Sequence, residues 1–171
     1  MKTFISIDPS STACGWCVWR KGKGLGGWKP RWFGTVKCKK GHWVERVGKI
    51  CVELMALLEE RVGVTGFGDN AIVCLIEMPK VWDQKKASAV VKLAVMAGAV
   101  GGWVLGGELA RRVEMVPVGK WKGQVKKEIT QKRVLRRYGI GIGGQGCESV
   151  VDHNTIDAIG IGDWWARKRK R

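Results

Sequence analysis

Apolar runs separated by polar turns divide the chain into predicted strands and helices. The run from Lys2 to Ile7 is apolar and rich in β-branched residues, which is typical of a buried strand. We predict that this strand stops at Asp8, because Pro9 cannot continue a central ladder. Small residues then turn the chain into a second predicted strand, Gly15 to Arg20, and a third follows from Arg31 to Lys37. Three antiparallel strands joined by short connections are therefore expected to open the domain.

The pattern changes to helical spacing from His42 to Val62, where apolar residues recur every three or four positions. A second buried strand is predicted from Ala71 to Met78, and it is apolar until Glu77. Because a helix joins this strand to the first, we expect a crossover that lays the two strands parallel. Asp8 and Glu77 would then lie at the same end of the sheet, the carboxyl edge where open α/β sheets usually hold their chemistry.

The second half of the chain is predicted to add a helix, a strand and a closing helix. Ala87 to Arg111 is apolar and rich in Ala and Gly, so it is expected to pack closely on its own sheet, with a seam between two copies as the alternative. A strand is predicted from Arg112 to Val118. The closing helix is predicted from Val150 to Trp165, with Asp152 as its N-cap.

The charge of the chain restricts its class of partner. Its 171 residues include 31 Lys and Arg against 15 Asp and Glu, a net charge of +16. This excess favours a polyanion, nucleic acid first and an anionic membrane surface second. The longest apolar run is interrupted by Lys92 and Glu108 and is too short between them to span a membrane, so no membrane segment is expected.

The length of the chain fits a single domain, residues 1–166, followed by a basic tail, residues 167–171, which is expected to be disordered. No signal peptide is predicted, because the chain starts directly with a strand. Five of the six cysteines lie in apolar or strand-like surroundings, which indicates packed, reduced thiols and a cytoplasmic protein.

The positive charge is concentrated between Gly119 and Tyr138, where Glu128 is the one acid. A helix face that contacts only solvent usually interleaves both signs of charge. This stretch does not, so we favour contact with phosphates over a solvated helix face. The predicted nucleic-acid-binding residues are Lys120, Trp121, Lys122, Lys126, Lys127, Lys132, Arg133, Arg136 and Arg137.

Three acids have special positions, because Asp8 and Glu77 end buried strands and Asp157 lies near the start of the closing helix. Alone, Asp8 could form a turn with its proline and Glu77 could pair with a lysine. Together, carboxylates about 5 Å apart repel by about 3 kcal/mol per pair at an effective dielectric of about 20, which calls for compensation by divalent cations. Oxygen ligands suit Mg²⁺ or Mn²⁺, and two such ions can hold the attacking and leaving oxygens of a phosphodiester. His153 and Asn154 are candidate further ligands on the same helix, or groups that place or deprotonate water.

Three motifs, in this order and spacing, resemble the RuvC family of Holliday junction resolvases, which lies within the RNase H-like superfamily. They are Ile5–Ser10, Leu75–Pro79 and His153–Gly162. The resemblance implies an α/β, RNase H-like fold with a mixed five-stranded sheet, three antiparallel strands and then two parallel ones, flanked by helices. It also implies a homodimer that uses Mg²⁺, with Mn²⁺ able to substitute and two ions per active site, to resolve four-way DNA junctions by symmetric paired nicks.

The resemblance assigns Asp8, Glu77 and Asp157 to three of the family's four metal-ligand positions. At the fourth position, three residues before the last aspartate, this chain has Asn154, and His153 precedes it by one residue. The stretch Trp121–Gly123 and the basic tail do not map onto cellular members, which suggests a phage-type member that acts in the cytoplasm of a bacterial or infected host cell.

Two other functions stay open on the sequence. The chain could be a nuclease of the same fold that acts on other branched DNA or on RNA–DNA hybrids, or a non-catalytic basic nucleic-acid-binding protein whose acids are structural. A zinc site of Cys14, Cys17, Cys38 and His42 is disfavoured, because Cys17 lies within a predicted strand and the second pair has the spacing Cys-x₃-His.

Overall fold

The structure, a computed structural model of the chain, describes residues 2–22, 27–62, 72–79, 87–123, 125–140 and 151–169. In chain order its elements are β1 (Thr3–Pro9), β2 (Ala13–Lys21), β3 (Trp28–Lys37), α1 (Trp43–Val62), β4 (Val73–Met78), α2 (Ala87–Gly106), β5 (Arg112–Pro117), α3 (Val118–Trp121), α4 (Lys127–Tyr138) and α5 (His153–Lys168).

The five strands form one mixed sheet in the order β3-β2-β1-β4-β5. β1 pairs antiparallel with β2, and β2 pairs antiparallel with β3, whereas β4 runs parallel to both β1 and β5. This topology confirms the predicted RNase H-like α/β architecture. Because Ile7 of β1 is the register partner of Ile76 of β4, the next residues, Asp8 and Glu77, come to the same edge of the sheet.

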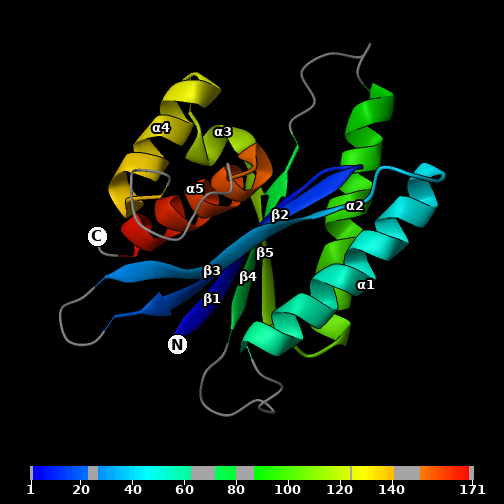
Figure 1. Cartoon of the computed structure of the whole chain (residues 1–171), viewed down its shortest axis with the longest axis horizontal. Coiled ribbons are helices and arrows are strands. Elements are labelled where there is room, and N and C mark those ends of the chain that lie inside the picture. Colours follow the sequence, from blue (N-terminus) through cyan, green and yellow to red (C-terminus); the bar gives the residue numbers. More distant parts are fainter. Residues whose placement is uncertain are drawn as a thin grey trace.

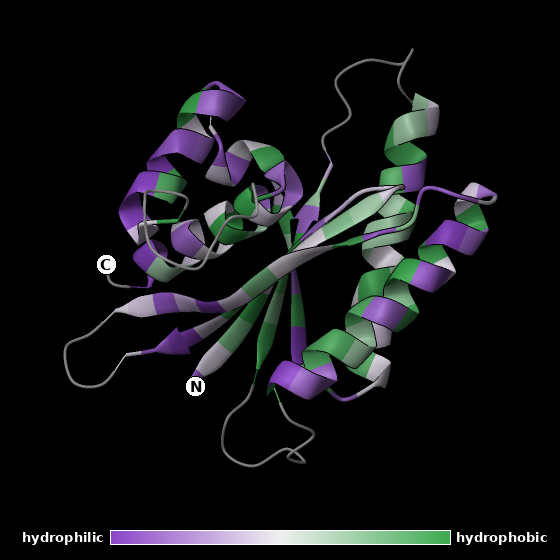
Figure 2. Ribbon diagram, viewed as in Figure 1, coloured by the Kyte–Doolittle hydropathy of each residue, from purple (hydrophilic) through white to green (hydrophobic). Residues whose placement is uncertain are grey.

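Helices cover both faces of the sheet (Figure 1), α1 and α2 on one face and α3, α4 and α5 on the other. Alternate residues of β1 supply the two cores, since successive side chains of a strand point to opposite faces. Ile5 and Ile7 pack against α1 and α2, and Phe4 packs in the core that includes Ile159 of α5. In Figure 2 α2 is apolar along most of its length, whereas α4 is largely hydrophilic.

Several boundaries differ from the prediction by a few residues, and two of these differences have local reasons. β1 includes Asp8 and Pro9, because its pairing with β4 ends at Ile7 and Pro9 faces only Cys14 of β2. A proline there interrupts no ladder with β4. Helix α2 ends at Gly106 and does not reach the predicted end at Arg111, because a second glycine directly follows Gly106.

Helix α5 begins after its predicted N-cap, since the Asp152 side chain accepts a hydrogen bond from the backbone N–H of Asn154 at 2.9 Å. The helix continues through Lys168, so the first two residues of the basic tail are helical. Residues 170 and 171 lie outside the described part of the chain.

The cysteines of the described residues are all free thiols, and Cys147 lies outside those residues. Cys14 packs in the core under α1 and α2, whereas Cys17 packs in the core under α5. Because the two side chains point to opposite faces of β2, they cannot share a metal ion, and the zinc alternative is wrong.

Gly15 of β2 lets the first turn of α5 rest directly on the sheet. A Cβ at this position would overlap the backbone carbonyl oxygen of Asn154 and would lie 2.7 Å from the backbone nitrogen of Thr155. Gly15 is also the register partner of Asp8. The missing side chain therefore brings the start of α5 beside the end of β1.

We expect Gly15→Ala to destabilise the protein by about 3 kcal/mol, the upper end of ordinary overpacking costs, because the atoms that it meets are backbone and cannot rotate away. Urea unfolding of the variant and the wild type measures this loss.

Gly48→Ala in α1 is the matched control. A Cβ at Gly48 meets nothing within 4 Å, so the same chemical change should stabilise the helix by about 0.5–1 kcal/mol. An unchanged midpoint for Gly15→Ala would contradict the close contact between α5 and β2.

Candidate active site

Three carboxylates from three elements meet at the carboxyl edge of the sheet. Asp8 comes from the end of β1, Glu77 from the end of β4, and Asp157 from the second turn of α5. The Glu77 and Asp157 carboxylates both act electrostatically on Asp8, and one ammonium group contacts Glu77 and Asp157 together. The structure thus brings together the three acids that the sequence places at strand ends and on the closing helix.

Asp8 is the most unfavourably placed of the three acids. Only 8% of the residue is exposed, and among the described residues none donates a hydrogen bond or ion pair to its carboxylate. Burial raises the pKa of Asp8 well above its usual value, and the Glu77 and Asp157 carboxylates raise it further, against the opposing effect of Lys122 and Lys127. The Asp8 carboxyl group is therefore buried and has no hydrogen-bond or ion-pair partner of its own among the described residues.

Lys122 supplies the cation that Glu77 and Asp157 share. Its Nζ atom lies 3.2 Å from Oδ2 of Asp157 and 3.5 Å from Oε2 of Glu77, and 16% of its side chain is exposed. Burial lowers the pKa of this ammonium group, but Glu77, Asp157 and Asp8 outweigh that effect and raise it overall. Lys122 is therefore held in its charged form between the acids.

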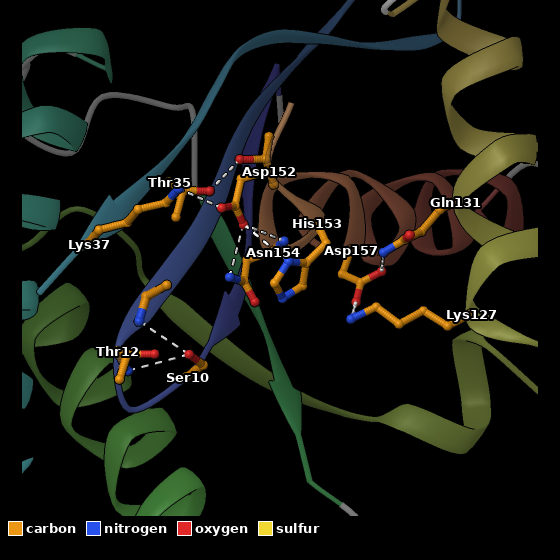
Figure 3. Close-up of polar contacts among 12 residues, drawn as sticks. Ser10, Thr12, Thr35, Lys37, Lys127, Gln131, Asp152, His153, Asn154 and Asp157 are labelled. Carbon is orange, nitrogen blue, oxygen red and sulfur yellow. Dashed lines mark hydrogen bonds and ion pairs between the residues drawn. The ribbon is translucent and has the colours of Figure 1, made fainter. Parts of the chain in front are cut away.

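Asp157 has two further partners on α4 (Figure 3). Nζ of Lys127 lies 3.3 Å from its Oδ2 atom, and Nε2 of Gln131 donates a hydrogen bond to its Oδ1 atom at 3.1 Å. Asp157 is 2% exposed, so these contacts compensate a charge that water hardly reaches. They also join α4 to the site.

Trp121 belongs to the site, and its predicted role in binding nucleic acid needs correction. Its indole Nε1–H donates a hydrogen bond to Oε2 of Glu77 at 2.8 Å, and its ring packs against Gly160 of α5. The residue is 8% exposed, so its face is not free to stack on a base. The sequence offered one signal of this role, a tryptophan within a strongly basic stretch.

The two candidate ligands at the start of α5 have different environments (Figure 3). Asn154 is buried, and its Nδ2 atom donates a hydrogen bond to Oδ1 of Asp152 at 3.0 Å. His153 has a 60% exposed side chain, with its Nδ1 atom 3.7 Å from Oδ1 of Asp152. Asp152 is itself paired with Lys37 at 2.7 Å. In the part of the chain that the structure describes, no contact joins His153 to Asp8, Glu77 or Asp157.

The donor chemistry of the site fits a hard divalent cation. Within the described ranges, no three His, Cys, Asp or Glu side chains are arranged so that they could hold a metal ion. The ammonium group of Lys122 instead lies between two of the carboxylates. Carboxylate oxygens are the ligands that Mg²⁺ and Mn²⁺ prefer, so the chemistry of the donor atoms suits such an ion, although their arrangement here holds a lysine.

The predicted nucleic-acid-binding residues divide into paired and unpaired cations. Lys122 and Lys127 bind the acids of the site, and Arg137 binds Asp163 of α5 through two contacts of 2.9 Å. The other predicted nucleic-acid-binding bases are exposed and form no ion pair among the described residues; they are Lys120, Lys126, Lys132, Arg133 and Arg136. Several of them line a groove along α4, the helix that reaches Asp157. The positive surface thus lies on the exposed face of α4, and the opposite face of the same helix contacts Asp157 through Lys127 and Gln131.

Comparison with solved structures shows a RuvC-like fold. The chain is 20% identical to the RuvC structure of Thermus thermophilus, with a TM-score of 0.65 and coverage of 98% of this chain and 96% of that one. For T. thermophilus RuvC in complex with a Holliday junction substrate the values are 18%, 0.68, 97% and 96%. The yeast mitochondrial Holliday junction resolvase Ydc2 is 8% identical, with a TM-score of 0.57 and coverage of 98% and 80%. No protein-family model and no curated protein matches the sequence.

We expect Asp8→Asn to stabilise the protein at pH 7 in the presence of a chelator. The wild-type carboxylate has a pKa raised above 3.8, so its ionisation costs stability progressively as the pH rises from 3.8 through the raised value. Each unit of elevation corresponds to about 1.4 kcal/mol, and the amide avoids this cost. Urea unfolding at a series of pH values measures the difference, which should vanish below pH 3.8.

Glu53→Gln, at an exposed position of α1, is the control and should change stability by less than about 0.5 kcal/mol across the series. A wild type more stable than Asp8→Asn at pH 7 without metal would contradict the unfavourable placement of Asp8.

Proposed function

We propose that this protein is a metal-dependent, structure-selective DNA endonuclease that resolves four-way junctions by paired symmetric nicks. The observation that carries the proposal is the convergence of Asp8, Glu77 and Asp157 next to α4, a helix whose exposed face is strongly basic. A cluster of acids alone would repel the phosphates of DNA, and a basic surface alone would only bind them. Their combination suits hydrolysis of a phosphodiester.

Asp8, Glu77 and Asp157 would hold the Mg²⁺ or Mn²⁺ ions, with Asn154 as the nearest candidate for a further ligand. Bound there, such ions supply an activated water and stabilise the charge that develops on the phosphate oxygens. The Nδ2–H group of Asn154 is committed to Asp152, which leaves its carbonyl oxygen as the atom able to bind a cation. His153, on the exposed side of the same turn, is placed to contact water or substrate rather than the three acids.

The remaining side chains of the site orient the carboxylates and compensate their negative charge. Trp121 fixes one oxygen of Glu77, and Gln131 fixes one oxygen of Asp157, so each carboxylate keeps a defined direction. Lys122 and Lys127 balance the acids before substrate binds, and both are close enough to the site to contact a phosphate after a divalent ion replaces them. The exposed bases of α4 would hold the DNA backbone through contacts that depend strongly on salt.

Paired nicks require two active sites, and the outer face of α2 suits contact with a second copy of the chain. Met96, Ala97 and Val100 pack in the core against the sheet, as the sequence predicted for this helix. The other side exposes Val91, Val95, Trp103 and Leu105, each at least 45% exposed. By length and composition α2 could also cross a membrane. However, the sheet covers one apolar side of the helix, and a dimer interface would account for the other.

The proposal predicts that the purified protein cuts a four-way junction in Mg²⁺ at symmetric positions in two opposite strands, and that Asp8→Asn abolishes this cutting. The variant should bind the junction as tightly as the wild type or more tightly, because it loses a negative charge near the phosphate. Gel assays of cutting in Mg²⁺ and of binding in EDTA measure the two effects.

Three outcomes would change the proposal. Cutting of flaps or RNA–DNA hybrids with intact junctions would assign a different substrate. Binding without cutting in either Mg²⁺ or Mn²⁺ would assign a non-catalytic nucleic-acid-binding protein. Full cutting by Asp8→Asn would remove Asp8 from the mechanism.

For the dimer, we expect light scattering to give twice the chain mass of 18.9 kDa for the wild type and 18.9 kDa for Trp103→Glu. A buried charge would disrupt an apolar interface through α2. Val52→Glu, at an exposed apolar position of α1, is the control and should stay dimeric. A dimeric Trp103→Glu would exclude this face as the interface.

A further inference from the structure

The ammonium group of Lys122 occupies the position that a cation shared by two carboxylates would take. Its Nζ atom lies 3.2 Å from Oδ2 of Asp157 and 3.5 Å from Oε2 of Glu77, and the Lys122 side chain is 16% exposed. The same ammonium group also attracts the carboxylate of Asp8. One basic side chain therefore acts on all three acids of the site.

An aromatic ring holds this ammonium group from another direction. Nζ of Lys122 lies 4.4 Å from the centre of the Trp121 ring, a cation–π contact. The ring is itself held in place by its hydrogen bond to Glu77 and by its packing against Gly160. Lys122 therefore lies in a preformed cation site that is built from two carboxylates and an indole ring.

Both carboxylate oxygens of Asp157 already have partners within the chain. Oδ1 accepts a hydrogen bond from Gln131, and Oδ2 contacts the ammonium groups of Lys122 and Lys127 (Figure 3 shows Gln131 and Lys127). A divalent ion shared by Glu77 and Asp157 would use the oxygens that Lys122 contacts, and its charge would repel the ammonium group. The lysine and the ion therefore exclude each other from these oxygens.

Lys122 is better placed than Lys127 to exclude an ion from the site. Among the described residues Lys127 forms an ion pair with Asp157 only, and its side chain is 44% exposed. Lys122 contacts both acids and is less exposed, so solvent ions screen its interaction with them less. Its flexible four-carbon side chain can also rotate away from the acids while the backbone stays in place.

We propose that Lys122 is an internal competitor of the divalent ion and lowers the metal affinity of the DNA-free protein. This inference rests on the proposed function for the identity of the ion, but it concerns metal binding and not cutting. A site that is open in only a fraction of the molecules binds its ligand with an affinity reduced by that fraction. Lys122 thus determines the concentration of divalent ion at which the three acids are occupied.

The test compares Mn²⁺ binding by Lys122→Met and by the wild type without DNA, measured by electron paramagnetic resonance of free Mn²⁺. Methionine keeps an unbranched side chain but removes the charge. Lys122→Met should bind Mn²⁺ about tenfold more tightly, within the usual range of coupling between two ligands. Lys49→Met, at an exposed position of α1, is the matched control and should bind Mn²⁺ as the wild type does. Equal or weaker binding by Lys122→Met would overturn the proposal.

A measurement on the wild type keeps the proposal testable if Lys122→Met does not fold. Reductive methylation followed by mass spectrometry reports how accessible each lysine amine is. Lys122 should be labelled several-fold faster in saturating Mg²⁺ than in EDTA, whereas the labelling of Lys49 should not change. Equal protection of Lys122 in both conditions would contradict its displacement by the ion. Failure of the proposed function would appear separately, as junctions that stay intact in Mg²⁺ although the protein binds the metal.

Discussion

Repulsion among three carboxylates, two of them buried and one half-buried, is the constraint that the rest of this structure has to satisfy. Two carboxylates about 5 Å apart would repel by about 3 kcal/mol, a large fraction of the stability of a domain. The parallel pairing of β1 with β4 places Asp8 and Glu77 at one edge, and the bare backbone of Gly15 lets α5 bring Asp157 to them. Lys122 then balances two of the acids, so α3 and the turn after it are as much a part of the site as the strands.

Much of this arrangement could be predicted from the sequence, because it follows from strand ends. Asp8 and Glu77 each end an apolar run, one and two residues before a proline, and a crossover connection determines that parallel strands end at the same edge. The prediction for Asp157 required one more inference, that this residue lies on one face of a helix that begins after an N-cap. These features depend on periodicity and local turns, which survive when identity to solved relatives is 20% or less.

The direction of single side chains could not be predicted in the same way. Trp121 and Lys122 lie in a basic stretch whose pattern indicates a surface, yet the short helix α3 turns both toward the acids. His153 and Asn154 are adjacent, and only the hydrogen bonds to Asp152 distinguish the buried amide from the exposed ring. For α2, composition allowed contact with its own sheet or with a second copy, and the structure shows an apolar residue set on each side.

Lys122 has a consequence for how the protein matures. Small domains that depend on a structural metal fold only around it and unfold in a chelator. Here a tethered ammonium group provides a counter-charge for two of the acids from within the chain. A newly made polypeptide would then complete its tertiary structure before it encounters any inorganic ion, and under the proposed function metal loading would follow as a separate event.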